Sequence, residues 1–272
     1  MVNDISDQDF MLFSTLIYNQ SGIHFSSNNR SILESRLKER LKEQNLSNIQ
    51  AYYNLILKDP EEMKILLDSV TTNLTRFFRN TGHFQTLENH VIPDLVDYKK
   101  KKNNYYLKVW SAGCSTGEEP YSIAMILKEK LSPAIRTEII ASDLSLQSLM
   151  KAQEGFYTDN KVGGIPKPYL KKYFEKKHKG YQIKETIKSM VKFDYHNLKF
   201  ESGLRNVDIL FCRNVIIYFD KAAQKALINR FWDIMNSHSF LFLGHSESLF
   251  GMNTSFEFIK TDWTCIYGKI LQ

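Results

Sequence analysis

Cysteines are few in this sequence, and their placement is unlike that of a disulfide framework or a metal site. Three occur in 272 residues, an odd number, and Cys114, Cys212 and Cys265 are widely separated. Disulfide-rich domains and zinc sites need paired or closely spaced cysteines, so both classes are disfavoured. We therefore expect no metal, and we interpret the three thiols as small core residues.

Long hydrophobic runs are also missing. No apolar stretch approaches the roughly 18 residues needed to cross a bilayer, and the N-terminus lacks the basic start and apolar core of a signal peptide. We therefore expect a cytoplasmic protein without direct membrane insertion. Apolar residues make up 43% and aromatic residues 13% of the chain, which is ample for a sizeable globular core.

Two common nucleotide-binding signatures are absent as well. Neither G-x-G-x-x-G nor G-x-x-x-x-G-K-[ST] occurs, which disfavours a dinucleotide site and a P-loop. Instead, an apolar run from Leu107 to Trp110 enters a small-residue turn at 111–117, and a helix-like stretch follows. A strand that passes through glycines into a helix lets backbone N–H groups approach a nucleotide-like ligand. The pattern is typical of the first strand of a doubly wound α/β domain.

The periodicity of apolar residues changes along the chain. Residues 1–90 predict helices, and the polar run at 99–104 resembles a boundary. Behind it, short apolar runs alternate with amphipathic helices, which implies parallel βαβ units. The strand candidates are 107–110, 138–142, 207–211 and 240–244, followed by a terminal hairpin. We expect a helical domain over 1–90, a linker over 91–104 and an α/β domain over 105–272.

Positive charge is concentrated in one segment. The whole chain carries a formal charge of +6, whereas residues 161–205 hold twelve Lys/Arg against four Asp/Glu, a net of +8. Short-strand character around Lys179-Gly180 predicts a small β insertion at about 160–192. A localised basic patch predicts a localised acidic partner, either phosphate or carboxylate.

Polar residues stand at the expected ends of several strands. Asp143 closes the second strand, where a carboxylate can accept hydrogen bonds from ribose hydroxyls. Asn197 can meet an adenine edge and Leu198 its face, although a loop asparagine and a core leucine explain that pair equally well. Arg213 and Asn214 end another apolar strand, at the edge of open α/β sheets where ligands bind.

Two helical stretches allow both a functional and a structural interpretation. In 71–80, the side chains of Asn73, Thr75 and Arg79 can converge on a polar ligand, but capping and core packing explain the stretch nearly as well. In 28–42, an apolar stripe (Ile32, Leu33, Leu37 and Leu41) is flanked by basic residues, which form either a solvated face or a docking surface for an acidic helix. These basic residues are Arg36, Lys38, Arg40 and Lys42.

Six motifs, in this order along nearly the whole chain, closely resemble those of the CheR-type chemotaxis-receptor glutamate O-methyltransferases. They are TTNLTRFFR at 71–79, WSAGCSTGEEPYSIA at 110–124, ASD at 141–143, NL at 197–198, FCRNVIIYF at 211–219 and GHSE at 244–247. The resemblance implies an N-terminal all-α domain, then a Rossmann-like S-adenosylmethionine-dependent methyltransferase domain with a small inserted antiparallel β subdomain.

The resemblance also implies site residues. By matching position, the contacts to S-adenosylmethionine fall on Asn73, Thr75, Arg79, Glu118, Asp143, Asn197, Leu198, Arg213 and Asn214. Tyr218 and Arg79 are implied at the methyl-transfer site. The implied partners are methyl-accepting chemotaxis receptors, bound through acidic cytoplasmic helices and, in some family members, a C-terminal receptor peptide. A monomer that binds no nucleic acid is expected.

The implied reaction needs no catalytic triad. A glutamate with a reference pKa of about 4.3 is already a carboxylate at neutral pH, so no general base is required for attack on a sulfonium methyl group. Orientation in a closed site supplies much of the acceleration. Two rival functions stay open: methyl transfer to another acceptor, and a non-catalytic module whose basic segment 161–205 binds nucleic acid.

Overall fold

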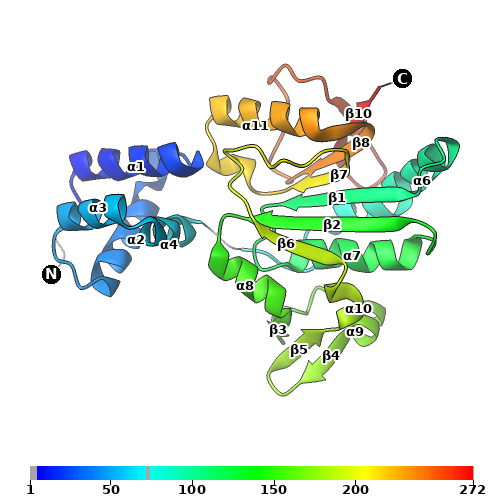
Figure 1. Ribbon diagram of the computed structural model, residues 1–272, viewed down its shortest axis with the longest axis horizontal. Coiled ribbons are helices and arrows are strands. Elements are labelled where there is room, and N and C mark those ends of the chain that lie inside the picture. Colours follow the sequence, from blue (N-terminus) through cyan, green and yellow to red (C-terminus); the bar gives the residue numbers. More distant parts are fainter. Residues whose placement is uncertain (1–4, 72–73, 272) are drawn as a thin grey trace.

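The fold is a helical domain joined to an α/β domain, as the sequence predicts. A computed structural model describes residues 5–71 and 74–271 (Figure 1). The helical domain contains α1 (Asp7–Ser21), η1 (Ser27–Asn29), α2 (Arg30–Glu43), α3 (Ile49–Lys58) and α4 (Pro60–Val70). Within the described residues, no helix combines the length and apolar character that a membrane span requires.

Local capping explains where these helices begin and end. The Ser6 hydroxyl accepts a hydrogen bond from the backbone of Asp9, and the Asp9 carboxylate accepts one from the backbone of Ser6, which is a capping box at the start of α1. Gly22 ends α1 at a φ of +78°, a conformation that glycine adopts without strain. Asp59 caps α4, and Pro60 takes its first position.

The α2 helix packs its apolar stripe into the helical domain, with two departures from prediction. Leu33, Leu37 and Leu41 are fully buried, whereas Ile32 is 47% exposed. Arg40, predicted on a solvated or docking face, is also buried and donates hydrogen bonds to the Glu62 carboxylate at 2.7 Å and 3.0 Å. Helical spacing alone could not predict the burial of Arg40, because Arg40 lies at the edge of the apolar stripe and its partner, Glu62, comes from α4.

The helix from Thr81 to Lys101 belongs with the sheet. It consists of α5 (Thr81–Thr86), the π-helical turn η2 (Leu87–Val91) and α6 (Ile92–Lys101). Its apolar side chains share a buried core with β1, not with the helical domain. We expected the helical domain to reach residue 90 and a linker to cover 91–104. In the structure this stretch is instead a helix that packs on the sheet. Its apolar residues recur at helical spacing, so that one face is buried: Leu87, Val91, Ile92 and Leu95.

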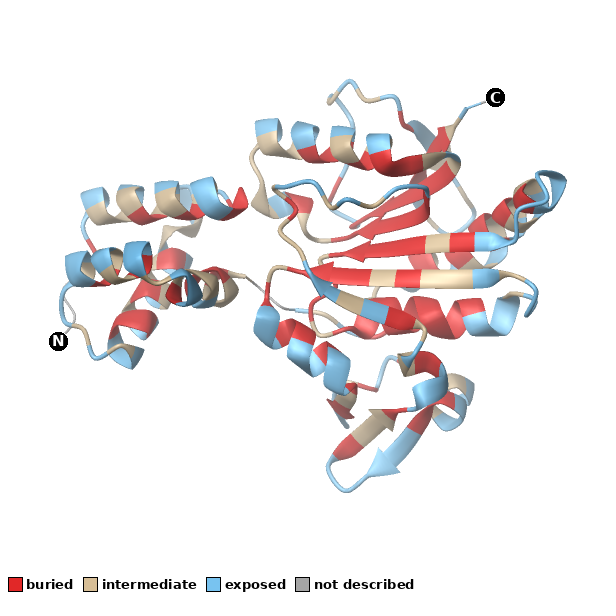
Figure 2. Cartoon of the chain, viewed as in Figure 1, coloured by how far each residue is buried: buried red, intermediate tan, exposed pale blue. Residues whose placement is uncertain are grey.

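Seven strands form the central sheet, in the order β6-β2-β1-β7-β8-β10-β9. The first five are parallel, and β10 runs antiparallel to both β8 and β9. Buried strands lie between covering helices in Figure 2. The bounds are β1 Tyr106–Ala112, β2 Arg136–Asp143, β6 Val191–Tyr195, β7 Val207–Cys212, β8 Met235–Leu243, β9 Glu257–Lys260 and β10 Cys265–Ile270. The predicted core strands and terminal hairpin are thus confirmed.

Each face of the sheet has its own helical cover. The helix α7 (Glu118–Lys130) and the helix over 81–101 share one buried core with β1, whereas α11 (Lys221–Ile234) packs in the other. The first core also takes in Leu149 of α8 (Leu146–Glu154). Because helices cover both faces of the sheet, its central strands are expected to be apolar on both sides. The sequence of β7 is almost continuously apolar, and β7 is buried throughout.

A three-stranded antiparallel β subdomain is inserted after α8, with strand order β3-β5-β4. Its elements are β3 (Phe156–Thr158), α9 (Lys167–Tyr173), β4 (Phe174–Lys177), β5 (Gly180–Ile183) and α10 (Glu185–Lys188). The hairpin predicted around Lys179-Gly180 is present. The insertion begins before residue 160, because β3 pairs with β5. A short strand whose partner lies more than twenty residues away leaves little local signal.

Candidate functional site

The turn after β1 lies beside the end of β2. Gly113 and Gly117 have φ values of +82° and +91°, and a Cβ on Gly113 would overlap the Val215 side chain. The turn therefore brings its backbone close to Asp143, whose Oδ2 accepts a hydrogen bond from the Ser115 N–H at 2.7 Å. The Ser145 N–H donates to Oδ1 at 2.8 Å. Burial raises the pKa of Asp143, and these backbone donors oppose that shift.

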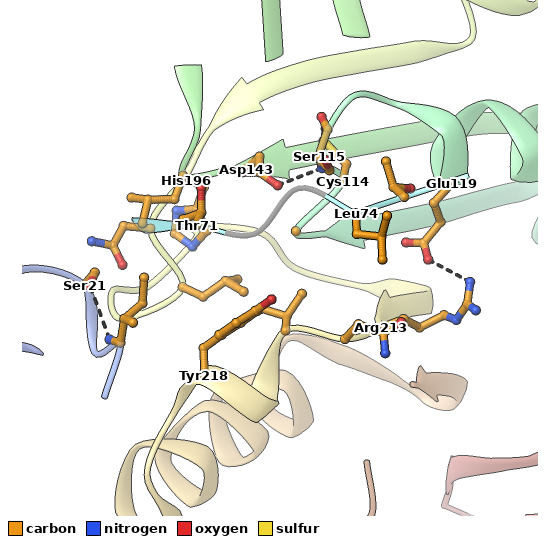
Figure 3. A pocket seen from close by; sticks show the side chains of 18 of the residues that line it. Ser21, Thr71, Leu74, Cys114, Ser115, Glu119, Asp143, His196, Arg213 and Tyr218 are labelled. Atoms are coloured by element: carbon orange, nitrogen blue, oxygen red, sulfur yellow. Dashed lines mark hydrogen bonds and ion pairs between the residues drawn. The ribbon is translucent and has the colours of Figure 1, made fainter. Parts of the chain in front are cut away.

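A cavity opens at this edge of the sheet, between the two domains. Its empty volume is about 920 Å³, which includes space open to solvent. Side chains of both domains line it (Figure 3). Eight of the predicted site residues are among them: Thr75, Arg79, Asp143, Asn197, Leu198, Arg213, Asn214 and Tyr218. Of the two remaining, Asn73 lies outside the described residues, and Glu118 lines a different cavity.

Arg213 connects three parts of the site. Its Nη1 donates to Glu119 Oε2 at 3.1 Å, and its Nη2 donates to the Arg79 carbonyl at 2.6 Å. The guanidinium lies over the Phe84 ring, 5.6 Å from its centre. Figure 3 shows the Arg213–Glu119 pair at one end of the cavity. Arg213 thus fixes the backbone of the connecting segment, which is the stretch 71–80 between α4 and α5, at Arg79, as well as the start of α7.

Glu119 is a cavity residue that the sequence prediction missed. Its Oε1 accepts a hydrogen bond from the Ser111 hydroxyl at 2.8 Å, and burial raises its pKa while Arg213 opposes the shift. Glu118 and Glu119 are adjacent in the first turn of α7, so their side chains project in different directions. The sequence shows the acidic pair but not which member faces which cavity.

Glu118 faces a second, larger cavity. Its carboxylate is fully buried, accepts a hydrogen bond from the Thr116 hydroxyl at 2.6 Å and lies 3.4 Å from Lys161 Nζ. This cavity lies between α2 and α4 on one side and α8 and β3 on the other. Thr71 lines both cavities, so the two meet at the start of the connecting segment.

Glu247 holds the loop that follows β7. Its carboxylate accepts hydrogen bonds from the backbone N–H groups of Asn214 and Val215, at 2.8 Å and 2.9 Å, and from that of Gly244. Asn214 has a φ of +60°, a left-handed conformation that asparagine tolerates better than most residues. The role of Glu247 was not predicted, although the motif GHSE contains it.

The helical domain supplies part of the site by direct contact. Asn197 Nδ2 donates to the Gln20 carbonyl at 2.8 Å, and the His24 N–H donates to the Tyr218 carbonyl at 2.8 Å. Leu198 is buried, and its carbonyl accepts a hydrogen bond from Arg230 at 2.7 Å. In Figure 3 the Tyr218 ring points from its short helix, η3 (Ile216–Tyr218), into the cavity.

These features suit a nucleoside-containing ligand. A buried acid ends β2, a glycine turn brings backbone close to it, and the cavity lies outside the carboxyl ends of parallel strands. Among the described residues, no group of three or more His, Cys, Asp or Glu side chains is arranged to hold a metal. Fold and site together define a doubly wound α/β protein with a cavity at the carboxyl ends of its parallel strands, lined in part by a helical domain.

Comparison with known proteins identifies the family. Residues 8–71 match the family description "CheR methyltransferase, all-alpha domain", and residues 73–265 match "CheR methyltransferase, SAM binding domain". The chain belongs to the CheR methyltransferase family and is an S-adenosylmethionine-dependent methyltransferase. The predicted family, fold class and methyl donor are therefore confirmed.

Curated relatives cover nearly the whole chain. A chemotaxis protein methyltransferase of Borreliella burgdorferi is 37% identical over 265 residues, which is 94% of this chain and 93% of that protein. One from Escherichia coli is 36% identical over 253 residues, covering 90% and 85%. Chemotaxis protein methyltransferase 2 of Vibrio cholerae is 33% identical over 261 residues, covering 93% and 89%.

Proposed function

We propose that this enzyme transfers methyl groups from S-adenosylmethionine to glutamate side-chain carboxylates of chemotaxis receptors, forming methyl esters. The observation that carries the proposal is the match of both CheR domains in order, with residue 72 alone between them. Relatives named chemotaxis protein methyltransferases, at 33–37% identity over almost the full chain, support it.

We propose roles for the residues around the first cavity. Asp143 accepts hydrogen bonds from the ribose, Asn197 and Leu198 contact the adenine, and Asn214 lies beside the methionyl part of the donor. Asn73, Thr75 and Arg79 contribute from the connecting segment, with Arg213 holding the Arg79 backbone. Glu118, which lines the neighbouring second cavity, contributes from the start of α7. Tyr218 and Arg79 stand at the transfer site. Bound S-adenosylmethionine supplies an electrophilic methyl group, and these side chains orient it and exclude water.

We propose that the second cavity receives the receptor helix. Its walls carry Arg36 of α2 and Lys151 of α8, which can pair with glutamates of an acidic helix, and they also carry the carboxylates of Glu39, Glu43, Asp68 and Glu118. Lys161 lines the same cavity but is paired with Glu118 and is left out of the proposal. Arg40, part of the docking face that the sequence suggested, is engaged with Glu62 and is left out of the proposal. The β subdomain contributes to receptor docking beside this cavity.

The deciding experiment is methylation of receptor-containing membranes with radiolabelled S-adenosylmethionine, followed by alkali. A glutamate methyl ester releases its label as volatile methanol, whereas an N-methyl group keeps it. We expect alkali-labile label on the receptor band. Alkali-stable label, or label on another class of molecule, would favour a different acceptor.

Because of the basic segment 161–205, nucleic-acid binding is the alternative function to test. Several of its lysines already pair with carboxylates, such as Lys172 with Glu129 at 2.7 Å and Lys192 with Glu138 at 3.0 Å, which reduces the charge left for phosphates. We expect binding to DNA to be weaker than binding to receptor helices at physiological salt. We also propose that the protein is a monomer and acts in the cytoplasm. Light scattering of the purified protein tests whether it is a monomer.

A further inference from the structure

One lysine of the β subdomain, Lys161, lies between the start of α7 and the connecting segment. Lys161 follows β3, and its Nζ lies 3.4 Å from Glu118 Oε1 and 3.4 Å from the Thr75 carbonyl oxygen. Glu118 begins α7, and Thr75 lies in the segment that joins the two domains. A single side chain therefore contacts two of the positions to which donor binding is assigned above.

The charge balance at Glu118 depends on this lysine. The Glu118 carboxylate is fully buried, and it forms an ion pair with Lys161, whose side chain is 40% exposed. A buried carboxylate that loses its counter-charge is strongly disfavoured where it stands. Lys161 brings its charge to the site from the solvent edge on a long aliphatic stem.

Packing fixes the loop that carries Lys161. A Cβ on Gly164 would lie 2.9 Å from the Phe77 carbonyl oxygen, so this loop and the connecting segment approach backbone to backbone. The Tyr157 hydroxyl donates to the Thr116 carbonyl at 2.7 Å, and the Tyr157 ring packs edge-on against Phe77 at 4.7 Å. The β subdomain, the glycine turn and the connecting segment are thereby locked together next to Lys161.

We infer that Lys161 is a positioning residue for methyl-donor binding, acting through the Glu118 carboxylate and the Thr75 carbonyl. The β subdomain thus completes the donor site in addition to any contact it makes with a receptor. The inference rests on the proposed donor-binding roles of Glu118 and Thr75.

Calorimetric titration of the full chain with S-adenosylhomocysteine tests it. Lys161→Ala should raise the Kd about tenfold, the loss expected for one interaction with a charged group. Lys161→Arg, which keeps the charge, should stay within about threefold of wild type. Lys177→Ala removes another exposed lysine of the same subdomain, one paired with Glu175, and should change nothing. Unchanged affinity in Lys161→Ala, or equal losses in the alanine and arginine variants, would overturn the assignment.

A double variant shows whether Lys161 acts through Glu118. If it does, adding Lys161→Ala to Glu118→Gln should cost less than about threefold, because coupled residues do not give additive losses. A full tenfold loss in the Glu118→Gln background would contradict the inference. Far-ultraviolet circular dichroism and the Tm of each variant separate these effects from unfolding.

Steady-state kinetics add a readout that a general loss of structure would not reproduce. Lys161→Ala should raise KM for S-adenosylmethionine while kcat at saturating donor stays within about twofold of wild type. A fall in kcat with unchanged KM would oppose the inference. Donor binding needs no receptor, so a wild-type enzyme that binds S-adenosylhomocysteine but fails to methylate receptors would refute the proposed function and leave the Lys161 result intact.

Discussion

At the scale of single residues, the site depends on carboxylates that organise backbone. Asp143 accepts from the Ser115 and Ser145 N–H groups, and Glu247 accepts from four N–H groups of two loops. Each carboxylate fixes a loop that lines the cavity. Backbone donors of this kind hold an oxygen in place before any ligand arrives, which reduces the entropic cost of binding.

Asp143→Ala should weaken binding of S-adenosylhomocysteine by about 30-fold, or roughly 2 kcal/mol, because the proposed ribose acceptor is removed and the Ser115 turn loses its partner. Calorimetry measures the change. Asp143→Asn, which keeps one oxygen acceptor, should lie between wild type and alanine. Wild-type affinity in the alanine variant would remove Asp143 from the donor site.

Tyr218→Phe tests the hydroxyl that the Tyr218 ring carries into the cavity. With saturating donor, we expect single-turnover methylation to slow about fivefold, as for loss of one hydrogen bond of about 1 kcal/mol in the transition state. Quenched-flow assays on receptor membranes provide the rate. A variant that keeps the full rate would show that Tyr218 serves packing alone.

At the scale of secondary structure, the helix α2 has one face buried in the core of the helical domain and another face on the surface. Arg40 pairs with Glu62, and the Tyr52 hydroxyl donates to the same carboxylate at 2.7 Å. Burial raises the pKa of Tyr52, and Glu62 adds to the shift. The buried trio of Arg40, Glu62 and Tyr52 joins α2, α3 and α4.

Arg40→Ala should therefore destabilise the protein by about 3–5 kcal/mol, because Glu62 is left buried without a cation. Urea unfolding followed by circular dichroism measures the cost. Arg36→Ala, four residues away and partly exposed, is the matched control and should change stability by less than about 0.5 kcal/mol. A cost below about 1 kcal/mol for Arg40→Ala would mean that the ion pair adds little.

Helices and strands could be predicted where apolar residues recur at a regular spacing in the sequence. Features that depend on contacts between residues far apart in the sequence were harder to predict. The strands ending at Asp143 and Cys212 follow from apolar runs, and Asp143 was placed at its strand end from sequence. The burial of Arg40 depends on Glu62 in another helix, which no local pattern encodes. The orientations of Glu118 and Glu119 depend on how α7 is rotated against the sheet, which only packing determines.

At the scale of the whole molecule, the helical domain is tied to the α/β domain at several points. The Tyr18 hydroxyl donates to Asp220 at 2.9 Å, and Lys199 Nζ donates to the Tyr18 carbonyl at 3.1 Å. Together with the contacts of Asn197 and Tyr218, these bonds hold the helical domain beside the first cavity. The two domains nevertheless have separate hydrophobic cores.

A fragment beginning at residue 74 should fold, because both cores of the α/β domain lie within it, but it should bind S-adenosylhomocysteine at least about tenfold more weakly. Circular dichroism and calorimetry on the fragment give the two measurements. A folded fragment with wild-type affinity would show that the helical domain adds nothing to donor binding.

The two cavities beside the first turn of α7 bear on the order of events in catalysis. Under the proposed roles, donor and acceptor occupy separate cavities that adjoin at Thr71, and Glu118 binds the donor from between them. Spent donor can then be exchanged while a receptor stays bound. We expect random-order kinetics and processive modification, in which one encounter esterifies several glutamates on the same receptor helix before the enzyme departs.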